Sequence, residues 1–353
     1  MPSTSKPQPD ATPDADAPAP SSPPTAPAAP RRLLVWADAE RAPHVAGLIA
    51  ARGEAVTLVG VGGSRSAELG KLAADANAPI TDDLRALIAS SEADRLILAT
   101  AEHVAPRDLG MAVETGLDIR ALELPLTSLS DLREAIGDAA GPKGESPLVL
   151  TPSVLRTPGL AAASDPLPAL GEVRAVCVRH AGPARCGTVW TRLVDAWLAV
   201  LTLGKRPETI DATLRTKAAR QPDDPLAVHG TVVAHGRGLK ACAASVVVSD
   251  TALGTRRRID AFAEHGYLEL TDHAYLLLSD GDPPIDAAPD PHQPADFPAL
   301  LAHHAAQLDD DAHTHARTKL TRLREAVACG LATLLSARTG QPESPHGLLE
   351  LDR

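Results

Sequence analysis

Short apolar runs alternate with helical patterns over the first half of the chain. The runs predict strands at 33–36, 55–61, 95–99 and 118–122, and the helical spacing predicts helices at 40–52, 64–75, 82–89, 104–114 and 128–139. Strands that are apolar throughout and separated by helices are typical of a parallel sheet with both faces covered. We therefore expect a doubly wound α/β domain over residues 31–150.

The pattern changes after residue 151. One amphipathic helix is predicted at 188–203, and a last helix at 316–337. Strand-like segments occur at 173–178, 227–234, 241–248, 256–262, 267–270 and 273–278. Because most of these strands follow one another without helices between them, they indicate an antiparallel sheet. We expect an α+β domain with a largely antiparallel sheet over residues 151–340.

Both ends of the chain differ in composition from the predicted domains. Residues 1–30 contain ten prolines among Ala, Ser and Asp, and such a segment cannot bury enough apolar surface to fold. We expect a disordered tail over 1–30 and a flexible tail over 341–353. No apolar run approaches the roughly 18 residues that span a bilayer, and a signal peptide is not expected.

Net charge and cysteine spacing indicate which partners and which cell compartment to expect. The chain has 45 acidic against 34 basic residues and a formal net charge of −11, which argues against nucleic acid or an anionic membrane as partner. The four cysteines are scattered and form no C-x-x-C pair, so we expect reduced thiols and a cytoplasmic protein.

Several motifs occur in an order that matches one known family. Residues 94–100 (DRLILAT) precede His103, and Glu123-Leu124-Pro125 follows the fourth predicted strand. Further motifs lie at 154–158, 170–173, 254–257, 264–270 and 335–340. Together they resemble the Gfo/Idh/MocA oxidoreductases, the family of glucose–fructose oxidoreductase and inositol dehydrogenase. The resemblance covers about 33–345 and implies a Rossmann-like first domain, an NAD(P) cofactor, a sugar or polyol substrate, and homo-oligomers formed through the open face of the C-terminal sheet.

The loop after the first strand departs from a dinucleotide-binding loop. A Rossmann domain needs G-x-G-x-x-G there, and this chain carries Ala37, Ala39 and Ala42 at the three glycine positions. Asp38 and Glu40 add negative charge where a pyrophosphate would sit. We expect NAD(H) to bind poorly or not at all, with unusual binding through this loop as the alternative.

The residues after the second predicted strand argue in part for dinucleotide binding. Ser64 and Arg65 stand where an adenosine 2′-phosphate would lie, so NADP is favoured over NAD if any dinucleotide binds. The simpler interpretation is that Ser64 caps the next helix and Arg65 is solvated. By the resemblance, Thr100 at the end of the third strand is a further cofactor-binding candidate.

The resemblance also identifies two catalytic positions that have changed. Leu124 stands where the family has a lysine beside the nicotinamide, and leucine cannot donate a proton. The family's other acid/base group is a histidine on the helix at 188–203, which contains none here. Its polar members, Arg192 and Asp195, either form a surface pair or line a pocket. Together with Glu123 and His103, they are the catalytic candidates.

Three other clusters carry weaker signals. His303, His304, His313 and His315 lie near Asp309–Asp311, but we interpret them as a solvated connection, and no metal is expected. His180 and Cys186 have no visible acid or base partner. Alternation along a strand divides Arg256, Arg257 and Arg258 between its two faces, which indicates surface charge.

Three hypotheses of function remain open. The first is a divergent, non-catalytic or weakly active member that binds a small-molecule ligand. The second is an active NAD(P)-dependent oxidoreductase acting on a sugar or polyol through replacement residues. The third is a structural or interaction protein. Cofactor binding separates the second hypothesis from the others, and a ligand-induced thermal shift separates the first from the third.

Overall fold

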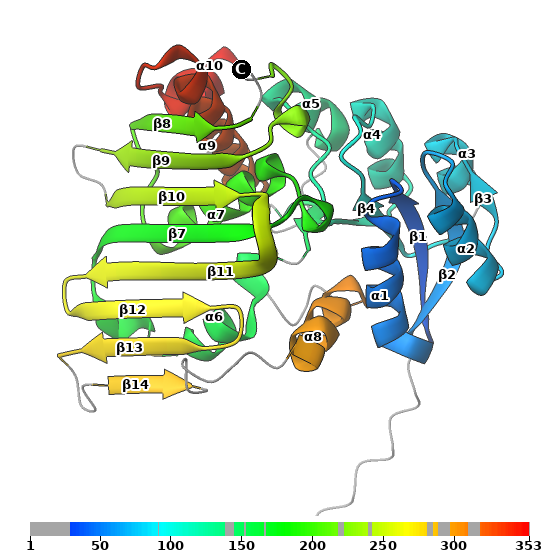
Figure 1. The fold of residues 1–353 in the computed structure, drawn as a ribbon, viewed down its shortest axis with the longest axis horizontal. Helices are drawn as coiled ribbons and strands as arrows, with labels where there is room; N and C mark the ends of the chain where they lie inside the picture. Colours follow the sequence, from blue (N-terminus) through cyan, green and yellow to red (C-terminus); the bar gives the residue numbers. More distant parts are fainter. Residues whose placement is uncertain are drawn as a thin grey trace, which may run out of the picture.

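The computed structural model covers the whole chain, and its described residues begin at Ala29. They are 29–90, 92–137, 145–151, 153–165, 167–217, 222–238, 242–280, 285–288, 297–309 and 318–352. The tail expected over 1–30 lies outside these residues, apart from its last two positions. Two sheets, each with its own helices, make up the described part (Figure 1).

The first sheet contains six parallel strands in the order β3-β2-β1-β4-β5-β6. They are β1 (Arg31–Ala37), β2 (Val56–Gly62), β3 (Ile80–Thr81), β4 (Arg95–Ala99), β5 (Asp118–Ala121) and β6 (Leu148–Leu150). This is the strand order of the dinucleotide-binding Rossmann fold, so the predicted doubly wound sheet is confirmed. The short edge strands β3 and β6 carry too little pattern to be found from the sequence.

Helices cover both faces of this sheet. They are α1 (Ala42–Arg52), α2 (Ala67–Asp75), α3 (Leu84–Ala89), α4 (Pro106–Glu114) and α5 (Leu129–Ile136). Alternate residues of β1 point to opposite faces: Leu33 and Val35 pack with α1 and α2, whereas Leu34 packs with α3, α4 and α5. This two-sided burial explains why the strands read as continuous apolar runs.

The second sheet has eight strands in the order β14-β13-β12-β11-β7-β10-β9-β8. They are β7 (Val173–Pro183), β8 (Thr209–Arg215), β9 (Thr231–Arg237), β10 (Ala243–Ser249), β11 (Thr251–Ala263), β12 (Gly266–Thr271), β13 (Tyr275–Ser279) and β14 (Ile285–Ala288). β10 runs parallel to β7, and the other neighbouring pairs are antiparallel. The expected α+β domain is confirmed.

One face of the second sheet is covered by helices. α7 (Val189–Leu203) and α9 (Leu320–Thr339) lie behind it in Figure 1, and the short α6 (Pro158–Ala163) lies beside β12 and β13. Trp190 and Trp197 of α7 are fully buried, and the indole N–H of Trp197 donates to Thr333 of α9 at 3.0 Å. In the described part of the chain no helix covers the opposite face, where Phe262 is 47% exposed.

Three helices were not expected from the sequence: the short α6, α8 (Phe297–Asp309) and α10 (Pro345–Leu351). α8 returns from the second sheet to pack on α1, burying Ala305 and Leu308 in the first domain's core. α10 lies in the segment expected to be flexible. It packs on α9, and Asp352 after it pairs with Arg324 at 2.8 Å, so these contacts hold the segment in place.

Candidate functional site

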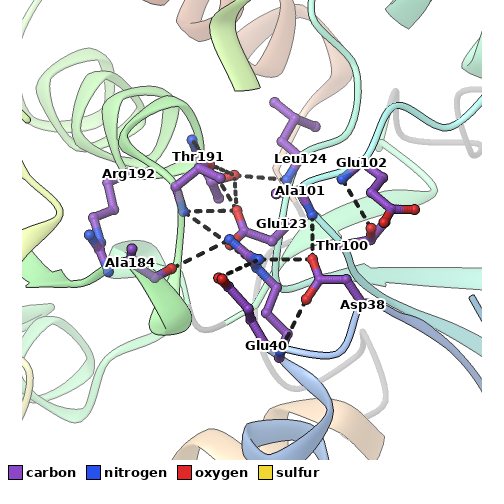
Figure 2. A network of polar contacts seen from close by, with 12 residues as sticks. Asp38, Glu40, Thr100, Ala101, Glu102, Glu123, Leu124, Ala184, Thr191 and Arg192 are labelled. Atoms are coloured by element: carbon purple, nitrogen blue, oxygen red, sulfur yellow. Dashed lines mark hydrogen bonds and ion pairs between the residues drawn. The ribbon is translucent and has the colours of Figure 1, made fainter. Parts of the chain in front are cut away.

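A buried polar network joins the two domains at the carboxyl ends of the first sheet's strands. Asp38 follows β1, Arg41 precedes α1, Thr100 follows β4, and Glu123 lies just beyond β5. The strand order reverses between β1 and β4, and ligands of doubly wound sheets bind outside this point. Figure 2 shows the network, which occupies the place where the sequence located a dinucleotide loop.

The carboxylate of Asp38 accepts three hydrogen bonds in this network. Its Oδ1 accepts from the backbone N–H of Arg41 at 3.0 Å, and its Oδ2 accepts from the backbone N–H of Ala101 at 2.9 Å. Oδ2 also accepts from the Arg41 guanidinium at 2.8 Å. Free N–H groups at the start of a helix attract an anion. At the start of α1 that anion is the chain's own Asp38.

Arg41 links this carboxylate to a second one. Its Nε lies 2.6 Å from Oε1 of Glu123, and its side chain is only 6% exposed. Burial alone lowers the pKa of Arg41, but the charges of Glu123 and Asp38 outweigh it, and the pKa is raised above its ordinary value. The guanidinium is therefore held charged between two carboxylates.

Glu123 in turn bonds to the second domain. It accepts from the backbone N–H of Thr188 at 3.0 Å, from the hydroxyl of Thr188 at 2.9 Å and from the hydroxyl of Thr191 at 2.8 Å. Thr188 is the N-cap of α7, so Glu123 also lies at the positive end of that helix. The acid that follows β5 is thus fully engaged within the protein.

The side chain of Leu124, next to Glu123 in the sequence, belongs to the apolar core and not to the polar network. The residue is fully buried, and its backbone N–H donates to Oγ1 of Thr191 at 2.9 Å. The position where the resemblance implies a lysine thus lies in apolar surroundings.

The other cofactor candidates make contacts within the chain. Ala37 and Ala42 are buried and Ala39 is exposed, whereas Thr100 accepts from the backbone N–H of Glu102 at 3.0 Å. Ser64 donates to Glu102 at 2.5 Å.

The simpler interpretation of Ser64 as a helix cap is wrong. Ser66 caps α2, because the chain enters the helix two residues later, and its side chain accepts from Leu69. The interpretation of Arg65 as a solvated side chain fits the structure. Arg65 is 84% exposed and pairs with Asp82 at 2.9 Å.

A cavity of about 200 Å³ lies beside this network, between the two domains. Its polar lining residues come from both domains and are His44, Thr151, His180, Cys186, Thr191, Arg192, Asp195, Thr255, Arg257, Asp272 and His304. Concave sites that combine an apolar wall with a few converging polar groups are where small ligands bind.

Arg257 is a charged group of the cavity that pairs with two carboxylates. It bonds to Asp195 at 2.8 Å and to Asp272 at 2.6 Å. The alternation predicted for residues 256–258 is correct, but the expectation of surface charge is wrong for Arg257, since it points to the helix-covered face and is 6% exposed. Arg258, on the other face, pairs with Asp260.

Three histidines of the cavity are held neutral. Burial lowers the pKa of His44, and burial together with Arg257 and Arg192 lowers that of His180 well below its usual range. Burial and Arg257 lower the pKa of His304 to about 4. The Nδ1 of His180 lies 3.7 Å from Oδ2 of Asp195, so the histidine that seemed isolated in the sequence lies beside an acid.

The catalytic candidates separate into two groups. Arg192 and Asp195 are both buried and line the cavity, whereas Glu123 belongs to the network described above. Burial raises the pKa of Asp195, although Arg257 acts against this shift. His103 is exposed and does not line the cavity.

The histidine cluster near Asp309 is only partly described. His303 and His304 lie on α8, and the Nε2 of His303 lies 2.7 Å from the carbonyl oxygen of Arg156. His313 and His315 fall outside the described residues. Among the residues that the structure does describe, no three His, Cys, Asp or Glu side chains are grouped as metal ligands.

Solved structures match nearly the whole chain, whereas no protein-family profile and no curated protein does. An oxidoreductase from Agrobacterium radiobacter, solved with NAD+, L-tartaric acid and magnesium, is 12% identical; the match covers 90% of this chain and 99% of that one, with a TM-score of 0.67. Levoglucosan dehydrogenase, solved with NADH and levoglucosan, is 14% identical over 89% and 98%, with a TM-score of 0.66. GenD2 from gentamicin A biosynthesis, solved with NAD, is 17% identical over 90% and 97%, with a TM-score of 0.65.

The fold is that of the Gfo/Idh/MocA oxidoreductases. A fold does not fix an activity, so the chemistry has to come from the site. None of the helices in the described part combines the length and the apolar character needed to cross a bilayer.

His180 is one of the three histidines that line the cavity, and the sequence did not indicate that its side chain is buried there. His180 comes from β7, not from α7, where the resemblance implies a histidine. The predicted strand ended at Val178, but the alternation of Val176 and Val178 continues to His180 and Gly182 on the covered face. Following that alternation two residues further would have placed His180 inside.

Proposed function

We propose that this chain binds a small molecule in the interdomain cavity and does not use a nicotinamide dinucleotide for catalysis. The observation that carries the proposal is the closed network of Asp38, Arg41 and Glu123. These three side chains satisfy one another, and Asp38 also takes up the backbone N–H of Arg41 at the start of α1, where a pyrophosphate would bind.

A dinucleotide does not fit this arrangement. A pyrophosphate at the start of α1 would displace the carboxylate of Asp38 from two backbone N–H groups and meet its negative charge. Displacing Asp38 would also remove one partner of the buried Arg41, and breaking a buried ion pair costs about 3–5 kcal/mol. The core position of Leu124 supports the loss of proton transfer, since no ionisable group stands there.

The cavity supports the binding half of the proposal. It keeps the location of a substrate site at the domain interface and has a polar lining drawn from both domains. Carboxylate, imidazole and guanidinium groups line the cavity, which is large enough for a small polar molecule.

An active NAD(P)-dependent oxidoreductase is the second candidate, because the Agrobacterium enzyme, levoglucosan dehydrogenase and GenD2 were solved with NAD+, NADH or NAD. In that case His180 and Asp195 would replace the missing acid/base residues. A preference for NADP gains no support, since those three structures contain the unphosphorylated cofactor and Arg65 pairs with Asp82.

Titration of the purified full chain with NADH and NADPH, followed by nicotinamide fluorescence, tests the proposal. We expect no saturation at micromolar concentrations and no turnover of sugars or inositols in a coupled absorbance assay. Saturation with either cofactor together with turnover would establish the second candidate instead.

The compartment and the assembly are also proposals. All four cysteines are free thiols in the structure, which supports a reducing compartment such as the cytoplasm. The uncovered face of the second sheet carries Val247 and Phe262, and we propose that a second copy of the chain packs there.

A further inference from the structure

Among the residues that the structure describes, Arg192 is a buried cation without a carboxylate in contact. Its guanidinium donates to three backbone carbonyls: Nη1 to Gly182 at 3.0 Å and to Ser249 at 2.9 Å, and Nη2 to Pro183 at 2.7 Å. The residue is 2% exposed and lines the cavity. Across the described ranges, no carboxylate lies within 4.0 Å of this guanidinium, so its charge lacks a direct counterion.

Two other buried arginines near the cavity, Arg41 and Arg257, do have carboxylate partners. Arg41 has Asp38 and Glu123, and Arg257 has Asp195 and Asp272. The pKa is raised for both of them, but for Arg192 burial lowers it, and the more distant carboxylates of Glu123 and Asp250 do not offset that effect. A buried charge without a partner is unfavourable, so this guanidinium is suited to an anion from outside the chain.

Further polar atoms of the lining also lack hydrogen-bond partners. Within the described residues these are Nε of Arg192, Nδ1 of His180 and Nε2 of His304. Leaving a buried polar atom unpaired is unfavourable, and three such atoms around one cavity call for a common explanation. A polar ligand in the cavity would supply the missing partners.

Two glycines keep space free around the guanidinium. A Cβ at Gly182 would lie 2.9 Å from Nη2 of Arg192, and a Cβ at Gly187 would lie 3.4 Å from its Nε. Gly187 also has a φ of +140°, which side chains rarely adopt, and it lines the cavity. The absence of both side chains leaves room beside the cationic group.

We infer that the cavity takes a small carboxylate with hydroxyl groups, such as a hydroxy acid or a sugar acid, with its negative charge toward Arg192 and its hydroxyls toward His180 and His304. This inference rests on the proposed function of the cavity. A monoanion fits better than a phosphate dianion, because both terminal nitrogens of Arg192 are already engaged by carbonyls. The neutral histidines can donate to or accept from hydroxyl groups.

Matched pairs of probes test the charge requirement on the full chain. D-glucuronate is compared with D-glucose and D-glycerate with glycerol, each by calorimetric titration. We expect at least one carboxylate to bind about tenfold or more tightly than its neutral analogue, since a hydrogen bond between two charged groups is stronger than one to a neutral hydroxyl. Equal binding of both members of every pair, or no response to either carboxylate, would overturn the inference.

Variants locate the charge contact. Arg192→Met should weaken carboxylate binding about tenfold or more, and Arg192→Lys should keep part of it, because the charge remains. Arg179→Met is the matched control, since Arg179 is exposed on the other face of the same strand as His180. Unchanged carboxylate binding in a folded Arg192→Met protein would contradict the inference.

An NADH titration of the same samples separates the two proposals. Binding of neutral sugars as tightly as the carboxylates, without NADH binding, would remove only the carboxylate inference and leave the proposed function intact. Saturable NADH binding would contradict the proposed function, whichever probes bind in the cavity.

Discussion

The cleft at the start of α1, which Asp38 and Arg41 line, and the interdomain cavity contain the same kinds of residue, but the charges are paired in the cleft and partly unpaired in the cavity. In the cleft, Arg41 bridges two carboxylates, and Glu123 accepts from Thr188 and Thr191 at the start of α7. In the cavity, Arg192 has only carbonyls, and two histidines have unpaired ring nitrogens. A site whose polar groups are already paired with one another has few hydrogen-bond partners left for a ligand. A site with unpaired polar groups is stabilised when a ligand supplies their partners.

The largest expected effect comes from breaking the closed network. Glu123→Ala removes the acid that holds Arg41 and Thr188, and it leaves a buried cation with one carboxylate fewer. We expect a loss of about 3–5 kcal/mol in the free energy of unfolding, measured with urea. Glu40→Ala is the control, because Glu40 is 73% exposed, and it should change stability by about 0.5 kcal/mol or less. Equal effects would show that the network contributes no special stability.

A lysine at position 124, which the resemblance implies, tests whether this part of the cleft can still support catalysis. Leu124→Lys places an ammonium group in a fully buried apolar position and should lower the free energy of unfolding by a few kcal/mol. It should not create dehydrogenase activity, because the glycine loop is absent. Leu253→Lys, at a 99% exposed residue, should be neutral. A stable and active Leu124→Lys enzyme would refute the account of the cleft.

The neutral histidines make the cavity sensitive to acid. The pKa of His304 is about 4 in the folded protein, below its ordinary 6.5, so the unfolded chain takes up the proton first as the pH falls. The stability that comes from keeping His304 neutral is therefore fully present above pH 6.5 and is lost as the pH falls toward 4. The pKa values of His44 and His180 are also lowered, so these two histidines act in the same direction.

His304→Gln should remove about 2 kcal/mol of the stability difference between pH 7 and pH 5, measured by urea unfolding at both values. His235→Gln, at an exposed position, should leave that difference unchanged. An unaltered pH dependence in the His304→Gln protein would mean that this imidazole is not held neutral by burial.

The smallest effect on stability is expected at the uncovered sheet face. Val247 lies on that face, between the buried Val246 and Val248. Val247→Asp should convert a dimer or larger assembly into a monomer in light scattering, with little change in the unfolding of the protomer. A monomeric unmodified protein over a tenfold concentration range would contradict the proposed assembly.

The fold was largely predictable because its cores repeat simple patterns. Apolar runs located β1, β2, β4 and β5, and strands in series indicated the second sheet. α8 could not be found in this way, because its buried residues pack on α1, more than 200 positions earlier in the chain. Burial against a distant element leaves only a weak local pattern.

The site was predictable only in part. The loss of the glycines and of the lysine was visible in the sequence, and Arg192 and Asp195 were identified on their helix. The pairing of Arg41 with Glu123 was not, since it joins residues 82 positions apart. Arg257 and His180 were misjudged because their burial depends on which face of the second sheet the helices cover.

A crystal structure of the full chain grown with millimolar NADH tests the central claim most directly. We predict that the guanidinium of Arg41 still bridges Asp38 and Glu123, and that the cleft at the start of α1 contains no nucleotide. Density for an ADP-ribose moiety at the start of α1, with Arg41 released from both carboxylates, would contradict the claim that the chain closes its own dinucleotide site.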